Sequence, residues 1–369
     1  MKIAFLSHFD LNLYLFRLPI MKELVRAKNE VFAVCPKGEY FEKFKDYGIK
    51  PVSYRIERSS LNPFKEISTI NNIRSVVRKI DPDILHTFTH KPNIYGNFSK
   101  ARNIINTVTG LGSFFIHEDI RSKTVRRVIE CLYKYSAKNS KKVIFQNPED
   151  LNYFVSKGII PEKKAILIKS SGVDTDFFKP TDKDKDLFEE LGLSYSKPVI
   201  LMIARVIKDK GVLEFIDAAE ILKEEAQFVY AGEIDEGNKN AFKPDFRNVK
   251  FLGFVKDVKR LISIADVVVL PSYREGIPKT LLEAAAMAKP LIATDVAGCR
   301  EVVKNGYNGF LVPPKDAKAL AEKIKILIDN EKIRNMFGKN GREYVKQEYD
   351  IRVVVERYLE LYDAVQKDN

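Results

Sequence analysis

The chain has 369 residues, of which 45% are hydrophobic and 30% are charged. This length predicts about two domains, and no apolar run approaches the roughly 20 residues of a membrane-spanning helix. The net charge of +12 comes from residues 1–180, which contain 31 lysines and arginines against 18 acidic residues. Such a basic half predicts an anionic partner, namely nucleic acid, acidic lipid or a phosphorylated substrate.

The N-terminus and the cysteines favour an intracellular protein. Met1–His8 has the pattern of one short strand and lacks the long apolar region and cleavage site of a signal peptide. The three cysteines, Cys35, Cys131 and Cys299, lie far apart and form no CxxC pair. We therefore expect a protein of the reducing cytoplasm.

The first half of the chain alternates between strands and helices, which predicts an α/β fold with a parallel sheet covered on both faces. Helices are expected, for example, at Leu18–Ala27 and Ile67–Ile80. The expected strands are Ile3–Ser7, Glu30–Cys35, Val52–Ile56, Ile84–Phe88, Asn103–Val108, Lys142–Gln146 and Ile166–Ser170.

A charged, irregular stretch at Asp174–Lys197 indicates a domain junction. A second alternating series follows it and predicts a second α/β domain, with a last helix at about Arg352 to Gln366. Its expected strands are Pro198–Ala204, Phe228–Ala231, Lys250–Phe254, Val267–Leu270, Leu291–Asp295 and Gly309–Val312.

The turn after Val267–Leu270 carries the most informative residues. Open α/β sheets bind ligands beyond the carboxyl ends of their strands, where the next helix offers unpaired N–H groups to a phosphate. Gly276 permits close approach of a ligand, and Pro278 suits a helix entry. Glu275 in the turn and Glu283 on the helix can bind hydroxyl groups on either side of the phosphates. The pattern predicts a site for a nucleotide sugar.

A second turn, after Pro198–Ala204, carries two cations. Arg205 follows the strand directly, and Lys210 comes five residues later, before a helix. Cations in these positions can hold a diphosphate without a metal ion. The DxD patterns Asp81–Asp83 and Asp182–Asp186 lie away from both turns and are typical of turn punctuation and of a solvated linker. We therefore expect no catalytic metal.

The spacing of Glu275 and Glu283, together with the two cations, resembles the E-x7-E motif of retaining glycosyltransferases of family 4, which have the GT-B fold. The resemblance covers most of residues 198–313. It implies that catalysis rests on Glu275, Arg205 and Lys210, with the UDP-sugar as co-substrate and no other cofactor. The donor-binding set that it implies is Arg205, Lys210, Phe254, Val255, Glu275, Gly276, Ile277, Thr280, Leu281 and Glu283.

The resemblance also implies the domain organisation. Two Rossmann-like, doubly wound domains are expected to face a cleft. The acceptor and membrane-side domain would cover 1–174, with the last helix at about 352–366 crossing back onto it. The nucleotide-sugar domain would cover 175–351.

The first domain supplies the residues expected on the acceptor side. The turn after its first strand has no glycine, so side chains there would meet the acceptor, and Thr109–Gly110 would line the cleft. For the histidines, a hydrogen-bonded structural role is an equal alternative. Cations of this domain would hold the acceptor diphosphate, Arg17 and Lys91 among them. The acceptor-side set is His8, Asn12, Arg17, His90, Lys91, Thr109 and Gly110.

Several first-domain stretches are similar to those of bacterial enzymes that build polyprenyl-diphosphate-linked glycans. They are His8–Ile20, Ser60–Phe64, Thr89–Asn93 and Thr109–Phe114. Among these enzymes, the stretches resemble the N-acetylgalactosaminyltransferases of Campylobacter-type protein N-glycosylation. This resemblance implies α1,3 transfer of GalNAc from UDP-GalNAc to undecaprenyl-diphospho-diacetylbacillosamine, on the cytoplasmic face of the inner membrane. Another polysaccharide or O-antigen glycosyltransferase is the alternative within the family.

Residues 119–142 predict a basic amphipathic helix. Its cations are Arg121, Lys123, Arg126, Arg127, Lys134 and Lys138. The apolar stripe is expected at Val125, Val128, Ile129, Leu132 and Tyr135 or Ser136. Such a helix can lie on an anionic bilayer as a peripheral anchor, or it can cover its own sheet with the cations in water.

Two other classes of function stay open. A UDP-sugar epimerase of the same fold would bind UDP similarly, but it needs acid–base carboxylates in the cleft, and the first domain shows no clear pair. A nucleic-acid-binding protein would suit the basic half, but no recognition motif supports it, so we expect no nucleic-acid partner.

Overall fold

Residue contacts divide the chain into two units, Met1–Ser171 with Ile351–Asn369 (unit 1) and Gly172–Asp350 (unit 2). The structure, a computed structural model, describes residues 1–57, 62–111, 115, 119–234 and 241–367, without the side chain of Arg121. The stretches Ser60–Phe64 and Thr109–Phe114 lie partly outside the described residues.

Unit 1 is built on a parallel sheet, whose described strands follow the order β3-β2-β1-β4-β5-β6-β7. Strands β1 and β2 are nearly continuous apolar runs and are buried over most of their length, as expected for a sheet between two helical layers. The strands are β1 (Lys2–Leu6), β2 (Glu30–Val34), β3 (Lys50–Val52), β4 (Ile84–Phe88), β5 (Asn103–Val108), β6 (Lys142–Phe145) and β7 (Ala165–Leu167).

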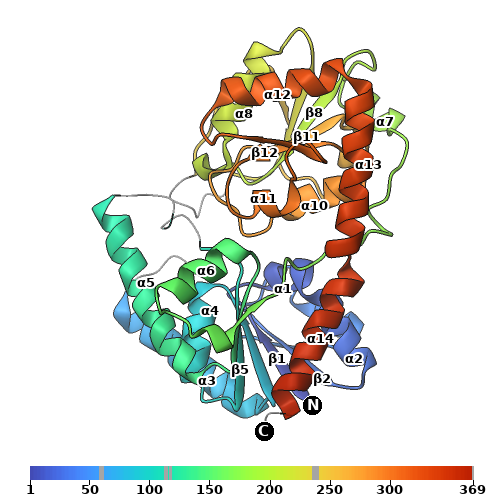
Figure 1. Ribbon diagram of the computed structural model, residues 1–369. Helices are drawn as coiled ribbons and strands as arrows, with labels where there is room; N and C mark the ends of the chain where they lie inside the picture. The colour runs from blue at the N-terminus through green and yellow to red at the C-terminus, as the bar shows by residue number, and fades with distance from the viewer. Residues whose placement is uncertain (58–61, 112–114, 116–118, 235–240, 368–369) are drawn as a thin grey trace. The chain divides into compact units, whose positions relative to one another are not determined.

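Two helical layers cover this sheet (Figure 1). Helix α14 contacts α2 on one face, and α4 contacts both α3 and α5 on the other. His86 of β4 fixes α14, because its ring nitrogens hydrogen-bond to Tyr362 Oη (2.6 Å) and Thr107 Oγ1 (2.7 Å). The helices are α1 (Asp10–Phe16), α2 (Leu18–Arg26), α3 (Pro63–Ile80), α4 (His90–Tyr95), α5 (Ile120–Asn139), α6 (Pro148–Ser156) and α14 (Ile351–Lys367).

Strand β3 ends at Val52, where the sequence predicted its start. Beyond Val52 the chain makes other hydrogen bonds. Tyr54 Oη donates to Ser7 O (2.8 Å), and Arg55 N–H donates to Asn72 Oδ1 (3.0 Å). These bonds to side chains replace the backbone hydrogen bonds between strands beyond Val52. The residues after Val52 therefore do not form the predicted strand, although their sequence pattern favours one.

Three further boundaries differ from the prediction. Helix α3 begins one turn earlier, because Asn62 Oδ1 accepts the N–H of Phe64 and caps the helix. Strands β7 and β10 end early, before Ser170 and Gly253, which both have φ of +65°.

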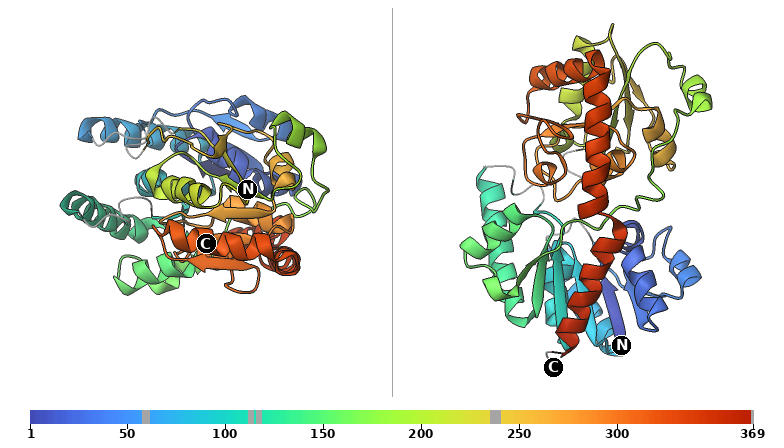
Figure 2. Two further views of the ribbon diagram at one scale, coloured as in Figure 1. Left: turned by 90° about the horizontal axis from the view of Figure 1, so that it is seen from above. Right: turned by 45° about the vertical axis from the view of Figure 1, so that its right-hand side comes forward.

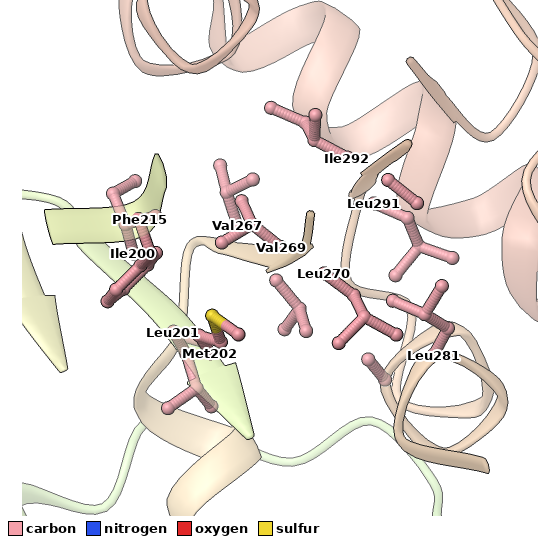
Figure 3. Close-up of a cluster of buried hydrophobic side chains, with 14 of the residues drawn as sticks. Ile200, Leu201, Met202, Phe215, Val267, Val269, Leu270, Leu281, Leu291 and Ile292 are labelled. Atoms are coloured by element: carbon pink, nitrogen blue, oxygen red, sulfur yellow. The ribbon is translucent and has the colours of Figure 1, made fainter. Parts of the chain in front are cut away.

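Unit 2 also has a parallel sheet, with its described strands in the Rossmann order β10-β9-β8-β11-β12-β13. Apolar side chains of β8, β11 and β12 pack against Phe215 of α8 and Leu281 of α10 (Figure 3). The strands are β8 (Val199–Ile203), β9 (Gln227–Ala231), β10 (Val249–Phe251), β11 (Val267–Leu270), β12 (Leu291–Thr294) and β13 (Gly309–Val312).

The stretch that we expected to be a solvated linker is partly folded onto unit 2. Asp184 caps α7 by accepting the N–H of Leu187 (2.8 Å). Arg260 donates to Asp184 Oδ2 (2.8 Å) and to Glu190 Oε1 (2.9 Å). The helices of this unit are α7 (Lys185–Glu190), α8 (Val212–Ile221), α9 (Val258–Ile264), α10 (Lys279–Ala286), α11 (Cys299–Val302), α12 (Ala317–Asp329) and α13 (Glu331–Glu348).

Candidate functional site

The strand order of unit 2 brings two loops to one edge of the sheet. The chain proceeds from β8 outward to β10 on one side, and from β11 outward to β13 on the other. The loops that follow β8 and β11 therefore diverge, and open α/β sheets bind ligands at this switch point. Arg205 follows β8 and Glu275 follows β11. The two loops singled out in the sequence lie at the same end of neighbouring strands.

Lys210 and Glu275 join these two loops. Lys210 Nζ donates to Glu275 Oε1 over 2.5 Å, and the two side chains are 18% and 11% exposed. A backbone bond from Tyr273 N–H to Asp209 O (2.9 Å) links the same loops, and the Arg205 side chain is exposed. A cation and a carboxylate, both largely shielded from water, are thus in contact at the switch point.

Two glycines allow close approach of the loops. A Cβ on Gly211 would lie 2.1 Å from Pro271 O, and one on Gly298 would lie 2.2 Å from Gly276 O. Both glycines also have positive φ, near +75°. The backbone at Glu275 and Gly276 therefore packs directly on the loop after β12. The sequence analysis missed this role of Gly298, although a glycine just after a strand is a signal for it.

Glu283 lies on α10 and is 7% exposed. Lys279 Nζ lies 3.7 Å from its Oε1. Burial raises the pKa of Glu283, and the charge of Lys279 opposes that shift. Near it, Ile277 and Thr280 are half-buried, whereas Leu281 is fully buried in the core and offers a ligand only its backbone.

Phe254 and Val255 follow strand β10. The Phe254 side chain is 62% exposed, and the Val255 side chain packs partly against the core of unit 2. An exposed ring beside a half-buried aliphatic side chain suits the edge of a planar base.

A side-chain pair that the sequence analysis missed supports the Glu275 loop. Tyr273 Oη donates to Glu214 Oε1 over 2.7 Å. Glu214 lies in the first turn of α8 and is 9% exposed, and its Oε2 accepts no hydrogen bond from the described residues. Burial, followed by the bond to Glu214, raises the pKa of Tyr273. The sequence signal for this pair was Glu214 itself, an acidic residue in the first turn of a largely apolar helix.

Unit 1 has its own switch point, between β1 and β4. His8 follows β1 and Thr89 follows β4, and His8 Nδ1 lies 2.6 Å from Thr89 Oγ1. Ser7 Oγ donates to Asn12 Oδ1 over 3.1 Å. Thr89 has φ of +72°, which is a strained conformation for a β-branched residue. Polar side chains thus gather at the carboxyl edge of this sheet as well.

His90 and Lys91 are engaged by protein groups. The Nδ1 of His90 lies 2.9 Å from Tyr133 Oη and its Nε2 lies 3.1 Å from Leu111 O, and burial lowers its pKa. Since Leu111 O can only accept, Nε2 carries the proton of a neutral ring. Lys91 Nζ donates to Glu66 Oε1 over 2.8 Å.

Arg17 is 1% exposed. Its guanidinium lies 4.5 Å from the centre of the Phe88 ring and donates to Tyr358 Oη over 3.5 Å. Burial lowers its pKa. Thr109 and Gly110, the remaining acceptor-side residues, directly follow β5, and Gly110 has φ of +131°.

Helix α5 packs against its own sheet by a face that includes only part of the predicted stripe. Tyr133, Ser136 and Ala137 are buried, and Asn97 Nδ2 donates to Ser136 Oγ over 2.9 Å. Val128 and Tyr135, which we placed on the apolar stripe, are 53% and 47% exposed. The predicted stripe is therefore right at Ile129, Leu132 and the alternative Ser136, and wrong at Val128.

The described residues contain no cluster of three or more His, Cys, Asp or Glu side chains that could hold a metal ion. Asp83 of the first DxD pattern accepts the N–H of Lys2 over 2.8 Å. Among the helices that are described, none combines the length and apolarity required to cross a membrane.

Two family models match the chain. The "Glycosyl transferase 4-like" model matches residues 2–147, and the "Glycosyl transferases group 1" model matches residues 183–344. The chain is 38% identical, over the whole of both proteins, to the N,N'-diacetylbacillosaminyl-diphospho-undecaprenol α-1,3-N-acetylgalactosaminyltransferase of Campylobacter jejuni. It is 25% identical to the UDP-Gal:α-D-GlcNAc-diphosphoundecaprenol α-1,3-galactosyltransferase of Escherichia coli, over 93% of this chain and 92% of the relative.

Solved structures match over both units. The sucrose-phosphate synthase of Thermosynechococcus elongatus aligns with a TM-score of 0.83 at 20% identity, and both chains are covered completely. Anabaena HepE in complex with UDP-glucose aligns with a TM-score of 0.82 at 21% identity, over 99% of this chain and 100% of HepE. The chain therefore belongs to glycosyltransferase family 4, and it has the GT-B fold of two parallel-sheet α/β domains.

Proposed function

We propose that this glycosyltransferase moves GalNAc from UDP-GalNAc, with retention, onto a polyprenyl-diphosphate-linked sugar in an α1,3 linkage. The acceptor would be undecaprenyl-diphospho-diacetylbacillosamine, the acceptor in the name of the C. jejuni relative. One observation carries the proposal: the contact of Lys210 with Glu275 at the switch point of unit 2. It puts a cation suited to a phosphate beside a carboxylate suited to sugar hydroxyls.

The other donor-side residues take roles that follow from their positions. Arg205 and Lys210 would bind the diphosphate, and the N–H groups at the start of α10 would add to that site. Glu275 would orient the sugar, and the buried Glu283 would accept hydroxyls of the nucleoside. Phe254, with Val255, would border the base.

The acceptor would bind at the carboxyl edge of the unit 1 sheet. His8 and Thr109–Gly110 follow β1 and β5, where parallel sheets offer ligand sites, and Asn12 lies near the start of α1, the helix after β1. His90 is held on both ring nitrogens, so it would support this edge. Arg17 and Lys91 would supply the positive field for the acceptor diphosphate.

A membrane surface is the proposed location of the enzyme, on the cytoplasmic face of the inner membrane. The outer face of α5 exposes Ile120 (85%) and Val128, together with Lys123, Arg127 and Lys134. In the left view of Figure 2, α5 (teal) and α3 (light blue) project on the same side of unit 1. Near the start of α3, Phe64 and Ile67 are 84% and 56% exposed. Apolar side chains interspersed with cations suit an anionic bilayer surface.

The proposed reaction needs no metal ion, because Arg205, Lys210 and the start of α10 supply positive charge to the diphosphate. Activity in excess EDTA, equal to activity with added Mg²⁺ or Mn²⁺, is the expected result. Complete loss in EDTA that either metal restores would contradict it.

The test of the function is UDP release from UDP-GalNAc, with and without a polyprenyl-diphosphate-linked diacetylbacillosamine. We expect UDP only when the acceptor is present. Conversion of UDP-GalNAc to another UDP-sugar without acceptor would favour an epimerase and overturn the proposal.

A further inference from the structure

The Lys210–Glu275 pair has a consequence for how the site distinguishes donor from product. Lys210 Nζ lies 2.5 Å from Glu275 Oε1, and both side chains are largely shielded from water, so the two charges interact strongly. Under the proposed function, on which this inference rests, Lys210 binds the diphosphate and Glu275 binds the sugar. In the structure, the Lys210 ammonium that would bind the diphosphate is thus bound to Glu275. The Glu275 carboxylate that would bind the sugar is bound to Lys210.

The backbones of both loops are tightly packed, since neither Gly211 beside Lys210 nor Gly298 beside the Glu275 loop has room for a Cβ. The difference in freedom between Lys210 and Glu275 therefore lies in their side chains. Lys210 has a flexible four-carbon stem and three N–H donors. The ammonium can therefore turn from the carboxylate to a phosphate oxygen, or be shared by both.

Donor and product differ in charge at this position. The terminal phosphate of a UDP-sugar is esterified and carries one negative charge. In UDP that phosphate is free, and since its second pKa is about 6 it carries close to two charges at neutral pH. A neighbouring carboxylate repels UDP more strongly than the donor, and only the donor offers that carboxylate sugar hydroxyls to accept.

We infer that Glu275 competes with product UDP for Lys210. With the intact donor, the carboxylate gains hydroxyl partners and releases the ammonium to the diphosphate. After transfer the hydroxyls leave with the acceptor, and the carboxylate takes the ammonium back. Glu275 thereby favours the intact donor over UDP and speeds release of the product.

The test is calorimetric titration of UDP and of UDP-GalNAc into the wild type, Glu275→Gln and Glu275→Ser. Both variants remove the charge, and both are expected to bind UDP about five- to tenfold more tightly than the wild type. Affinity for UDP-GalNAc is expected to stay equal or weaken. In a Lys210→Met background there is no ammonium to compete for, and only the direct repulsion of UDP by the carboxylate remains, so Glu275→Gln is expected to tighten UDP binding less than it does in the wild type. The matched control is Glu322→Gln, which removes an exposed carboxylate from α12 and should not change either Kd.

Folded Glu275→Gln and Glu275→Ser proteins that bind UDP no more tightly than the wild type would overturn the inference while leaving the proposed function standing. A wild type that binds neither UDP nor UDP-GalNAc would overturn both.

Discussion

Tyr273 donates its hydroxyl proton to the buried carboxylate of Glu214 over 2.7 Å, and this bond joins the Glu275 loop to the first turn of α8. The backbone N–H of Tyr273 also bonds to Asp209 O, in the loop that carries Lys210. One residue therefore fixes both loops of the candidate donor site. Because Glu214 Oε2 has no hydrogen-bond donor among the described residues, the Tyr273 hydroxyl is an important partner for this carboxylate.

Tyr273→Phe is expected to lower the free energy of unfolding by about 1–3 kcal/mol, because it leaves a buried carboxylate without this donor. It should also weaken UDP binding, since the loop that carries Glu275 loses a support. Urea denaturation and UDP titration measure the two effects. The control is Tyr195→Phe, which removes a hydroxyl from a 53% exposed ring of the same unit and should change little. Equal stability of the two variants would contradict the role given to the Tyr273–Glu214 bond.

Arg205→Ala and Lys210→Ala are each expected to raise the KM for the donor and lower kcat. Loss of one charged contact to the diphosphate costs on the order of 2–4 kcal/mol, or roughly 30- to 1000-fold in kcat/KM. Steady-state kinetics with UDP-GalNAc and the lipid-linked acceptor measure this change. A kcat/KM equal to that of the wild type in both variants would show that Arg205 and Lys210 do not bind the diphosphate.

The placement of the donor-side residues at one edge of the unit 2 sheet could be predicted because its signals are local. Val267–Leu270 is a continuous apolar run, and it forms β11 with the predicted bounds. Arg205 comes two residues after β8, which is a similar run, and Glu275 comes five residues after β11. Parallel strands place their carboxyl ends at one edge, so two loops 70 residues apart could be brought together from sequence alone.

Features that depend on long-range partners could not be predicted. Tyr54 leaves the β3 ladder for Ser7, which is 47 residues away, and Glu214 finds Tyr273 at a distance of 59 residues. At the end of the α5 stripe, the sequence left Tyr135 and Ser136 open as alternatives for a similar reason. Periodicity alone does not favour the serine, and its burial depends on a partner, Asn97, that is 39 residues away.

Membrane association should depend on the exposed cations of α5. Reversing Lys123, Arg127 and Lys134 to Glu is expected to release the protein from anionic vesicles, since each cation near such a surface contributes about 1 kcal/mol. Binding of the wild type should also fall in high salt. The matched control reverses Lys318, Lys332 and Lys339, exposed lysines of unit 2, and should retain binding. Sedimentation with vesicles measures both; equal binding of the two triple variants would place the membrane contact elsewhere.

Stability should fall on mild acidification because of His86. Burial, with the nearby charge of Arg17, holds the pKa of His86 well below its usual 6.5, so the folded chain keeps the ring neutral. The unfolded chain binds a proton near pH 6.5. The contribution of the neutral His86 to the free energy of unfolding is therefore complete above pH 6.5. It is lost as the pH falls below 6.5, and the free energy of unfolding then decreases by up to about 1.4 kcal/mol per pH unit. His90, whose pKa burial also lowers, adds in the same direction.

Urea denaturation at pH 7.5, 6.5 and 5.5 tests this dependence. The wild type is expected to lose stability between pH 6.5 and 5.5, and His86→Gln should show a smaller loss over the same range. Equal stability of the wild type at all three pH values would contradict a buried neutral His86.

The product should have an α linkage, which retains the configuration of the UDP-sugar. Retention through a covalent intermediate needs a carboxylate on the sugar face opposite the leaving group. No Asp or Glu of the first domain lies in a sequence motif suited to this role, and Asp10 and Glu118 are the remaining candidates. Asp10 already accepts the N–H groups of Leu11 (2.8 Å) and Tyr40 (2.7 Å), and Glu118 lies outside the described residues.

The resemblance to the retaining glycosyltransferases of family 4 instead implies a same-face substitution, in which the departing phosphate helps to deprotonate the acceptor hydroxyl. Arg205 and Lys210 would stabilise the leaving diphosphate, and Glu275 would orient the sugar, so Glu275→Gln should slow transfer without weakening UDP binding. The anomeric proton coupling of the product, measured by NMR, decides the stereochemistry. A β-linked product would contradict retention and this mechanism together, since the same-face path cannot invert the anomeric carbon.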